Sequence, residues 1–137
     1  RDDFSLQCIS ADKVYSVECD IFAPCALGAV LNNKTIPQLK CRVVAGGANN
    51  QLAEPEDAER LRDRGILYAP DYVINVGGAM FLIGMEAQDW TQKNMENKVT
   101  EGIQTVLQQI FELAAAKNIT TEAAARQVAE KRLSSVK

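Results

Sequence analysis

The chain has 137 residues, of which 47% are hydrophobic and 24% charged, and its formal net charge is -3. This is enough chain for one domain with a buried core, and the composition is typical of a globular protein. The negative charge gives no reason to expect a nucleic acid or an anionic membrane as partner. The longest mainly apolar run, residues 73–85, contains three glycines and is too short to span a bilayer.

Short strands that alternate with short helices are predicted for the first half of the chain. The expected strands are residues 6–9, 20–24, 41–45 and 66–69. Short helical turns are expected around residues 12–16 and at 35–39, where Thr35 would cap the helix and Pro37 lies in its first turn. The clearest helix signal begins near Pro55, with acids in the first turn and arginines in the last. Gly65 then marks its end.

The second half of the chain, from Gly78 onward, is predicted to be helical. A stripe of apolar residues recurs every three or four positions; it consists of Met95, Val99, Ile103, Val106, Ile110 and Leu113. Asn118 is expected to end this helix, and Thr120 or Thr121 to cap a last one. The residues of that last helix expected to pack inward are Val128, Ala129 and Leu133. The whole order predicts an α/β protein, a parallel sheet followed by C-terminal helices.

The sequence contains no histidine, which excludes imidazole bases, Ser-His or Cys-His nucleophiles and histidine metal ligands. The four cysteines form no C-x-x-C pair, so a metal site is not expected. We expect buried, reduced thiols in a cytoplasmic protein, with Cys25 as the one cysteine near a binding edge. No secretory signal is recognised after Arg1.

Three predicted strands end in small or amide residues, as at the ligand-binding edge of an open parallel sheet. Asn49 and Asn50 follow two glycines, which makes them either a simple turn or amides that face a flat ligand. Asn75 precedes Gly77 and Gly78, which form either a glycine turn or an exposed helix start that favours polar ligand atoms. Ala79 and Leu82 then share one helix face, which is either core or the wall of an apolar pocket.

The residues at these three strand ends resemble successive signatures of the Glu/Leu/Phe/Val dehydrogenases. Residues 23–28 read Ala-Pro-Cys-Ala-Leu-Gly, residues 46–52 read Gly-Gly-Ala-Asn-Asn-Gln-Leu, and residues 68–78 read Tyr-Ala-Pro-Asp-Tyr-Val-Ile-Asn-Val-Gly-Gly. They are most similar to the leucine, phenylalanine and tryptophan dehydrogenase branch, and the similarity continues to about residue 134. It implies an incomplete Rossmann-like sheet: strand and helix units over residues 1–78 and a helical tail over 79–137.

The resemblance implies NAD-dependent oxidative deamination of an L-amino acid to a 2-oxo acid and ammonia. It places Cys25, Ala26, Ala48, Asn50 and Asn75 near the nicotinamide end of NAD, and Asn49 near both cofactor and substrate.

By the same analogy, Ala79 and Leu82 set side-chain specificity. Their apolar nature favours an apolar substrate, because nothing there would compensate a desolvated carboxylate. The small Ala79 leaves room for an aromatic ring. Val76 replaces the family's more usual alanine and puts fine specificity in doubt.

The family's catalytic lysines and aspartate, its phosphate-binding glycine loop and its ribose-binding acid have no counterpart here. The resemblance therefore implies no catalytic residue in this chain, which is expected to be inactive alone and to need a missing N-terminal domain. An open sheet edge would be covered by that domain or by another copy of the chain, and a homo-oligomer is expected. Two alternatives remain: a non-catalytic binding or assembly module that keeps half a Rossmann fold, and another oxidoreductase on a similar sheet.

Overall fold

Three short parallel strands form the centre of the first half of the chain in the computed structural model, which describes residues 6–87 and 91–135. The strands are β1 (Ile21–Phe22), β2 (Val43–Val44) and β3 (Leu67–Tyr68), in the order β1-β2-β3. Ile21 pairs with Val43, and Val43 pairs with Leu67. The predicted parallel α/β arrangement is confirmed, although each strand is shorter than expected.

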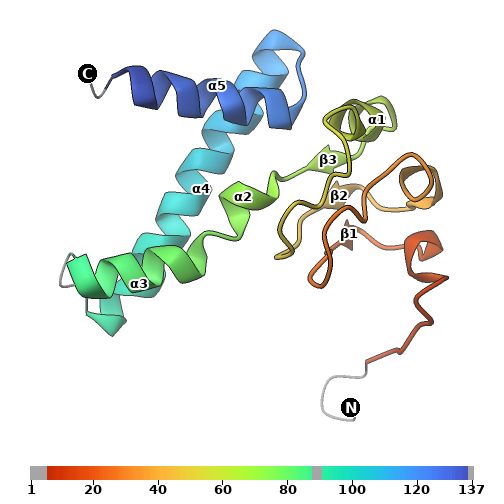
Figure 1. Cartoon of the computed structure of the whole chain (residues 1–137), viewed down its shortest axis with the longest axis horizontal. Coiled ribbons are helices and arrows are strands. Elements are labelled where there is room, and N and C mark those ends of the chain that lie inside the picture. Colours follow the sequence, from red (N-terminus) through yellow and green to blue (C-terminus); the bar gives the residue numbers. More distant parts are fainter. Residues whose placement is uncertain (1–5, 88–90, 136–137) are drawn as a thin grey trace.

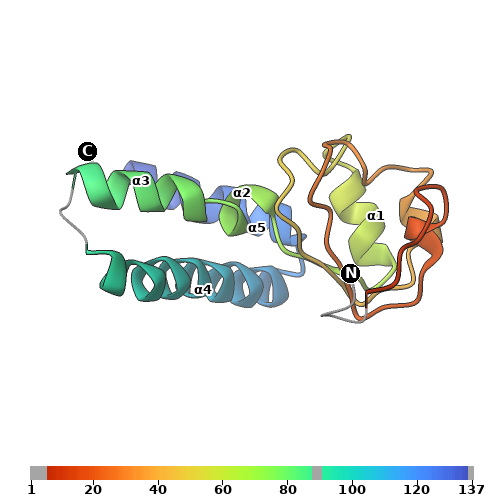
Figure 2. The same cartoon turned by 90° about the horizontal axis from the view of Figure 1, so that it is seen from below.

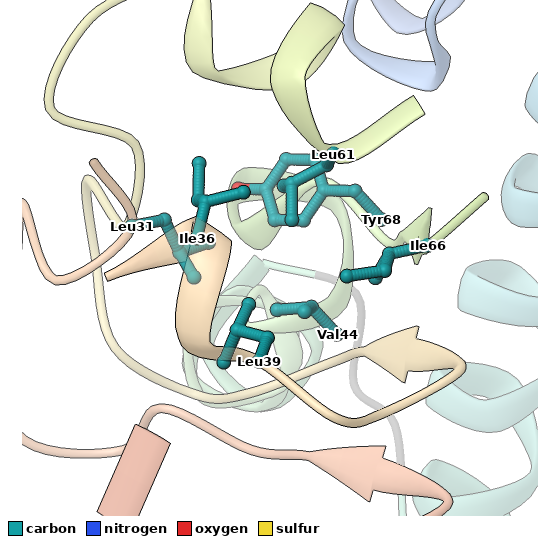
Figure 3. Close-up of a cluster of buried hydrophobic side chains, with 7 residues drawn as sticks. All are labelled: Leu31, Ile36, Leu39, Val44, Leu61, Ile66 and Tyr68. Atoms are coloured by element: carbon teal, nitrogen blue, oxygen red, sulfur yellow. The ribbon is translucent and has the colours of Figure 1, made fainter. Parts of the chain in front are cut away.

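One face of the sheet is covered by α1 (Asp57–Asp63) and by the 3-10 helix η3 (Ile36–Gln38). Seven side chains pack together between these elements and the strands (Figure 3); they are Leu31, Ile36, Leu39, Val44, Leu61, Ile66 and Tyr68. A second 3-10 helix, η2 (Val14–Ser16), adds Tyr15, whose ring centroid lies 5.7 Å from that of Phe22. The sheet therefore has its core on one side.

The helical half extends to one side of the sheet (Figure 1). It contains α2 (Asp71–Ile74), α3 (Gly77–Ala87), α4 (Gln92–Lys117) and α5 (Thr121–Ser134). Figure 2 shows α3 running alongside α4, and both α3 and α5 contact α4. Asn118 ends α4 with a left-handed backbone (φ 52°), and the Thr120 hydroxyl accepts a hydrogen bond from Ala123 N at 3.1 Å. These two helix ends agree with the sequence prediction.

Two predictions about the fold are wrong, and one helix was missed. Residues 6–9 form no strand; Leu6 and Ile9 are 65% and 43% exposed, because no neighbouring strand or helix covers them. In α5, Val128 packs against α4, but Ala129 is exposed and Leu133 is 74% exposed. Figure 1 shows α5 crossing α4 at an angle, and the exposure of these two side chains shows that they lie on a side of α5 that does not pack against α4. The short helix α2, directly after β3, was not predicted.

No helix in the described ranges combines the length and the apolar character needed to cross a membrane.

Candidate functional site

Three loops lie at the carboxyl edge of the sheet, because parallel strands all end on the same side. We call residues 23–28 rim 1, residues 46–50 rim 2 and residues 75–78 rim 3; they follow β1, β2 and, through α2, β3. Rim 1 carries Cys25, rim 2 carries Asn49 and Asn50, and rim 3 begins with Asn75.

Rims 1 and 2 are held together by backbone groups. Ala48 N donates a hydrogen bond to Pro24 O at 2.9 Å, and Gly47 N donates to Cys25 Sγ at 3.4 Å. Gly46 allows this approach, because a Cβ built on it would lie 2.1 Å from Pro24 O. Asn50 adopts a left-handed conformation (φ 53°), which asparagine tolerates better than most residues.

Rims 2 and 3 are joined by the two asparagine side chains. Asn75 Nδ2 donates a hydrogen bond to Asn49 Oδ1 at 2.5 Å. This pairing uses the acceptor of Asn49 and the donor of Asn75, so Asn49 Nδ2 and Asn75 Oδ1 have no protein partner in the described part of the chain. The rim thus offers one amide donor and one carbonyl acceptor side by side, and the structure brings Cys25, Asn49 and Asn75 into one neighbourhood.

The other predicted site residues differ in exposure. Ala26 and Asn50 are exposed like Cys25, whereas the side chain of Ala48 is buried (5% exposed), so only the backbone of Ala48 could face a ligand. Ala79 and Leu82 lie on the first two turns of α3; both are exposed, Leu82 by 60%. Neither side chain belongs to a core cluster of the described structure.

Sequence reasoning missed two buried polar residues behind the rim. Gln51 is 0% exposed and Asp71 is 6% exposed. Gln51 N donates to Asp71 Oδ2 at 3.1 Å, and Tyr72 N donates to Asp71 Oδ1 at 2.9 Å. The available signal was the position of these polar residues: Gln51 directly follows rim 2, and Asp71 comes shortly after β3. Only the tertiary structure reveals that both side chains are buried.

The cysteines are less buried than expected. All four are free; Cys8 and Cys25 are exposed, while Cys19 and Cys41 are half-buried. Partial burial and the neighbouring Cys19 thiol raise the pKa of Cys41. The prediction of buried thiols is therefore wrong: all four cysteines lie outside the short strands, and Cys41 alone packs partly against the core cluster of the described structure.

Charged groups gather behind the rim rather than on it. The three rims contain no lysine, histidine or carboxylate. Burial raises the pKa of Tyr68 well above its usual value, and burial together with the Glu122 carboxylate does the same for Tyr72. Among the described residues, no group of three or more His, Cys, Asp or Glu side chains could hold a metal ion. The rims therefore present amide groups, and Cys25 is their one side chain of a type that can transfer a proton.

The chain matches known proteins both in sequence and in fold. The sequence pattern of the glutamate/leucine/phenylalanine/valine dehydrogenase family matches residues 2–137. The leucine dehydrogenase of Thermoactinomyces intermedius is 47% identical over 96% of the chain, and the phenylalanine dehydrogenase of Lysinibacillus sphaericus is 43% identical over 93%. The crystal structure of L-tryptophan dehydrogenase from Nostoc punctiforme superimposes with a TM-score of 0.86 and 41% identity over 93% of the chain.

The chain is much shorter than these relatives. It covers 35% of the leucine dehydrogenase, 33% of the phenylalanine dehydrogenase and 38% of the tryptophan dehydrogenase chain. A hetero-hexameric glutamate dehydrogenase from Thermus thermophilus shares the fold at 19% identity, with a TM-score of 0.78. The similarity thus spans almost the whole chain but about a third of each of the three closer relatives.

Proposed function

The chain belongs to the glutamate/leucine/phenylalanine/valine dehydrogenase family, and we propose that the protein containing it deaminates an L-amino acid oxidatively, with NAD as cofactor, to a 2-oxo acid and ammonia. The observation that carries this proposal is the contact between the three rims, above all the hydrogen bond between the Asn49 and Asn75 side chains. It supports a single binding edge at the end of the sheet, where ligands of open α/β sheets bind.

The nicotinamide end of NAD fits the groups that the rim leaves without partners. Its carboxamide has one acceptor oxygen and one donor nitrogen, which complement Asn49 Nδ2 and Asn75 Oδ1. Cys25, Ala26 and Asn50 are exposed beside them and would border the ring, with the backbone of Ala48 beneath. NAD, when bound, would supply the hydride acceptor. The part of the chain described here would bind and orient it, since the rims carry no catalytic side chain.

An apolar or aromatic L-amino acid is the proposed substrate. Ala79 and Leu82 are exposed on the first turns of α3, a short way along the chain from Asn75, and neither offers a partner to a charged side chain. The matching relatives are named leucine, phenylalanine and tryptophan dehydrogenases, which supports the same class. The absence of bulk at Ala79 favours a ring over a short aliphatic chain, and Asn49 would contact both substrate and cofactor.

Further polypeptide is proposed to complete the active site. The uncovered face of the sheet carries an in-register apolar row, Ile21, Val43 and Leu67, with Ile21 57% and Leu67 41% exposed. Parallel sheets are normally covered on both faces. We propose that a catalytic N-terminal domain accompanies this chain, that the protein is a homo-oligomer, and that the chain alone is inactive. The four free cysteines support a cytoplasmic location.

The test is an activity assay on the longest protein that the coding sequence around this segment encodes, with the 137-residue chain assayed in parallel. We expect NADH formation with leucine, phenylalanine or tryptophan from the longer protein and none from the chain alone. Asn49→Ala should raise KM for both NAD and the amino acid. Amino-acid oxidation by the chain alone would contradict the proposal that the catalytic residues lie on a further domain. A longer protein that binds neither NAD nor amino acids but self-associates would favour the assembly-module alternative.

A further inference from the structure

Gln51 is fully buried although it follows two exposed asparagines on rim 2. Its Nε2 donates two hydrogen bonds, to Gly46 O at 2.6 Å and to Ala48 O at 2.9 Å. The side chain therefore closes the backbone of rim 2 into a loop. Its Oε1 is buried without a partner in the described structure, which costs stability. A buried polar atom without a hydrogen-bond partner is uncommon in folded proteins, and such exceptions are expected at functional sites.

Asp71 connects this loop to rim 3. Its Oδ2 accepts from Gln51 N at 3.1 Å, and its backbone carbonyl accepts from Asn75 N at 2.9 Å. The carboxylate therefore fixes the start of α2, and the single turn of α2 fixes Asn75. Because Asp71 is nearly fully buried, water competes little for these hydrogen bonds.

These contacts form a closed ring. It runs from Gln51 through the Asp71 carboxylate to Asn75, from the Asn75 side chain to the Asn49 side chain, and back along the backbone to Gln51. Every link is a hydrogen bond of 2.5 to 3.1 Å or a stretch of covalent chain. The ring determines which atom of each exposed amide is used internally and which remains free for a ligand.

We propose that Gln51 and Asp71 are positioning residues: they hold Asn49 and Asn75 so that the rim presents an amide donor beside a carbonyl acceptor. This inference rests on the proposed function, because the ligand to be oriented is the nicotinamide carboxamide together with the substrate. Neither residue touches that ligand. They act through the two asparagines, so their loss misorients the ligand while the rim residues themselves remain.

Two nearly isosteric variants disrupt these contacts: Asp71→Asn breaks the ring itself, and Gln51→Glu breaks the side-chain hydrogen bonds that close rim 2. Gln51→Glu places a carboxylate, which only accepts hydrogen bonds, against Gly46 O and Ala48 O. Asp71→Asn places an NH₂ group against the backbone N–H of either Gln51 or Tyr72. The matched controls are Gln38→Glu and Asp63→Asn, both exposed and away from the rims. Gln51→Asn is a milder third variant, since it keeps an amide but is too short to reach both carbonyls.

The first measurement is NMR of the ligand-free protein, observing the side-chain amide signals of Asn49 and Asn75. We expect both signals to shift, and the Asn75 NH₂ protons to exchange faster, in Asp71→Asn, in Gln51→Glu and in Gln51→Asn. The two controls should match the wild type. Unchanged amide signals in folded Gln51→Asn or Gln51→Glu protein would overturn the proposal, whatever the protein catalyses.

The second measurement is steady-state kinetics of the longest encoded protein, at a temperature where every variant is folded. Misplaced binding groups should reduce kcat/KM by on the order of tenfold to a hundredfold. In Gln51→Glu, activity relative to the wild type should partly recover as the pH is lowered, because a protonated carboxyl group can donate again. A role in folding alone would lower the unfolding temperature without this recovery. If the wild-type protein neither binds NAD nor oxidises an amino acid, the proposed function is wrong. The NMR result still decides whether Gln51 and Asp71 position the two asparagine side chains.

Discussion

Gly46→Ala should disrupt the contact between rims 1 and 2. A Cβ on residue 46 would lie 2.1 Å from Pro24 O, 2.4 Å from Pro24 N and 2.6 Å from Pro24 Cδ. Ordinary contacts of this kind need about 3.4 Å or more, so the two backbones would have to separate by about 1 Å. Neither segment is free to move, because Ala48 N bonds to Pro24 O and Ala45 N bonds to Phe22 O, at 2.9 and 3.0 Å.

The cost follows from these distances. Overpacking a tight site costs about 1–3 kcal/mol, and weakening the two backbone hydrogen bonds adds about 1 kcal/mol each. The free energy of unfolding should therefore fall by about 3–5 kcal/mol, which corresponds to a Tm decrease on the order of 12–20 °C for a domain of this size.

Urea denaturation followed by circular dichroism measures this change, with Gly47→Ala as the matched control. A Cβ on Gly47 would meet only Cys25 Sγ, at 3.9 Å. That variant should remain within about 1 kcal/mol of the wild type and could be slightly more stable, since alanine restricts the unfolded chain. If Gly46→Ala and Gly47→Ala unfold at the same urea concentration, the close approach of the rims is refuted.

Three further outcomes are expected. Because burial raises the pKa of Tyr68, its stabilising contribution is complete below about pH 10 and is lost as the pH rises further. Tyr68 alone should then lower the free energy of unfolding by up to about 1.4 kcal/mol per pH unit. In urea titrations above about pH 10, Tyr68→Phe should show a shallower slope than the wild type, and Tyr72, whose pKa is also raised, should account for a slope that remains. Thr120→Ala removes the acceptor for Ala123 N and should cost about 1 kcal/mol in the same titrations; an unchanged midpoint would show that the cap does not stabilise α5. Cys25 should react with a thiol reagent before Cys41, whose pKa is raised and which is half-buried; peptide mapping after brief labelling would contradict this if Cys41 were modified first.

The elements that sequence reasoning predicted correctly have strong local causes. The acids and arginines around α1, the spacing of Met95 to Leu113 along α4, and the cap at Thr120 depend on residues within a turn or two of one another. The strand predicted at residues 6–9 failed because a strand is stable only with a paired neighbour, and none lies there. The packing of α5 failed for a related reason: its residue pattern does not reveal which side of the helix faces α4, and Leu133 is 74% exposed.

The site was predicted in part. The glycine and asparagine residues at the strand ends indicated Cys25, Asn49, Asn50 and Asn75 as one edge, and the structure brings three of them together. Ala48 was expected to face the cofactor, yet its side chain is buried. Gln51 and Asp71 were missed, because a buried polar residue cannot be distinguished from an exposed one until its hydrogen-bond partners are known. Their contacts as ligand-positioning groups, like those of Ala79 and Leu82 with a substrate, remain predictions.

Sequence by itself determined the parallel α/β class, the helical second half, the lack of histidine among these 137 residues and the residue types at the strand ends, since each depends on residue type and short spacing. Only the tertiary structure decided how the asparagine amides are oriented and which face of the sheet is left open. Both depend on groups that are distant along the chain: the Asn49–Asn75 hydrogen bond spans 26 residues, and the Gln51–Asp71 hydrogen bond spans 20. Such pairings form only when the folded chain brings the ends of separate strands together, so no local pattern encodes them.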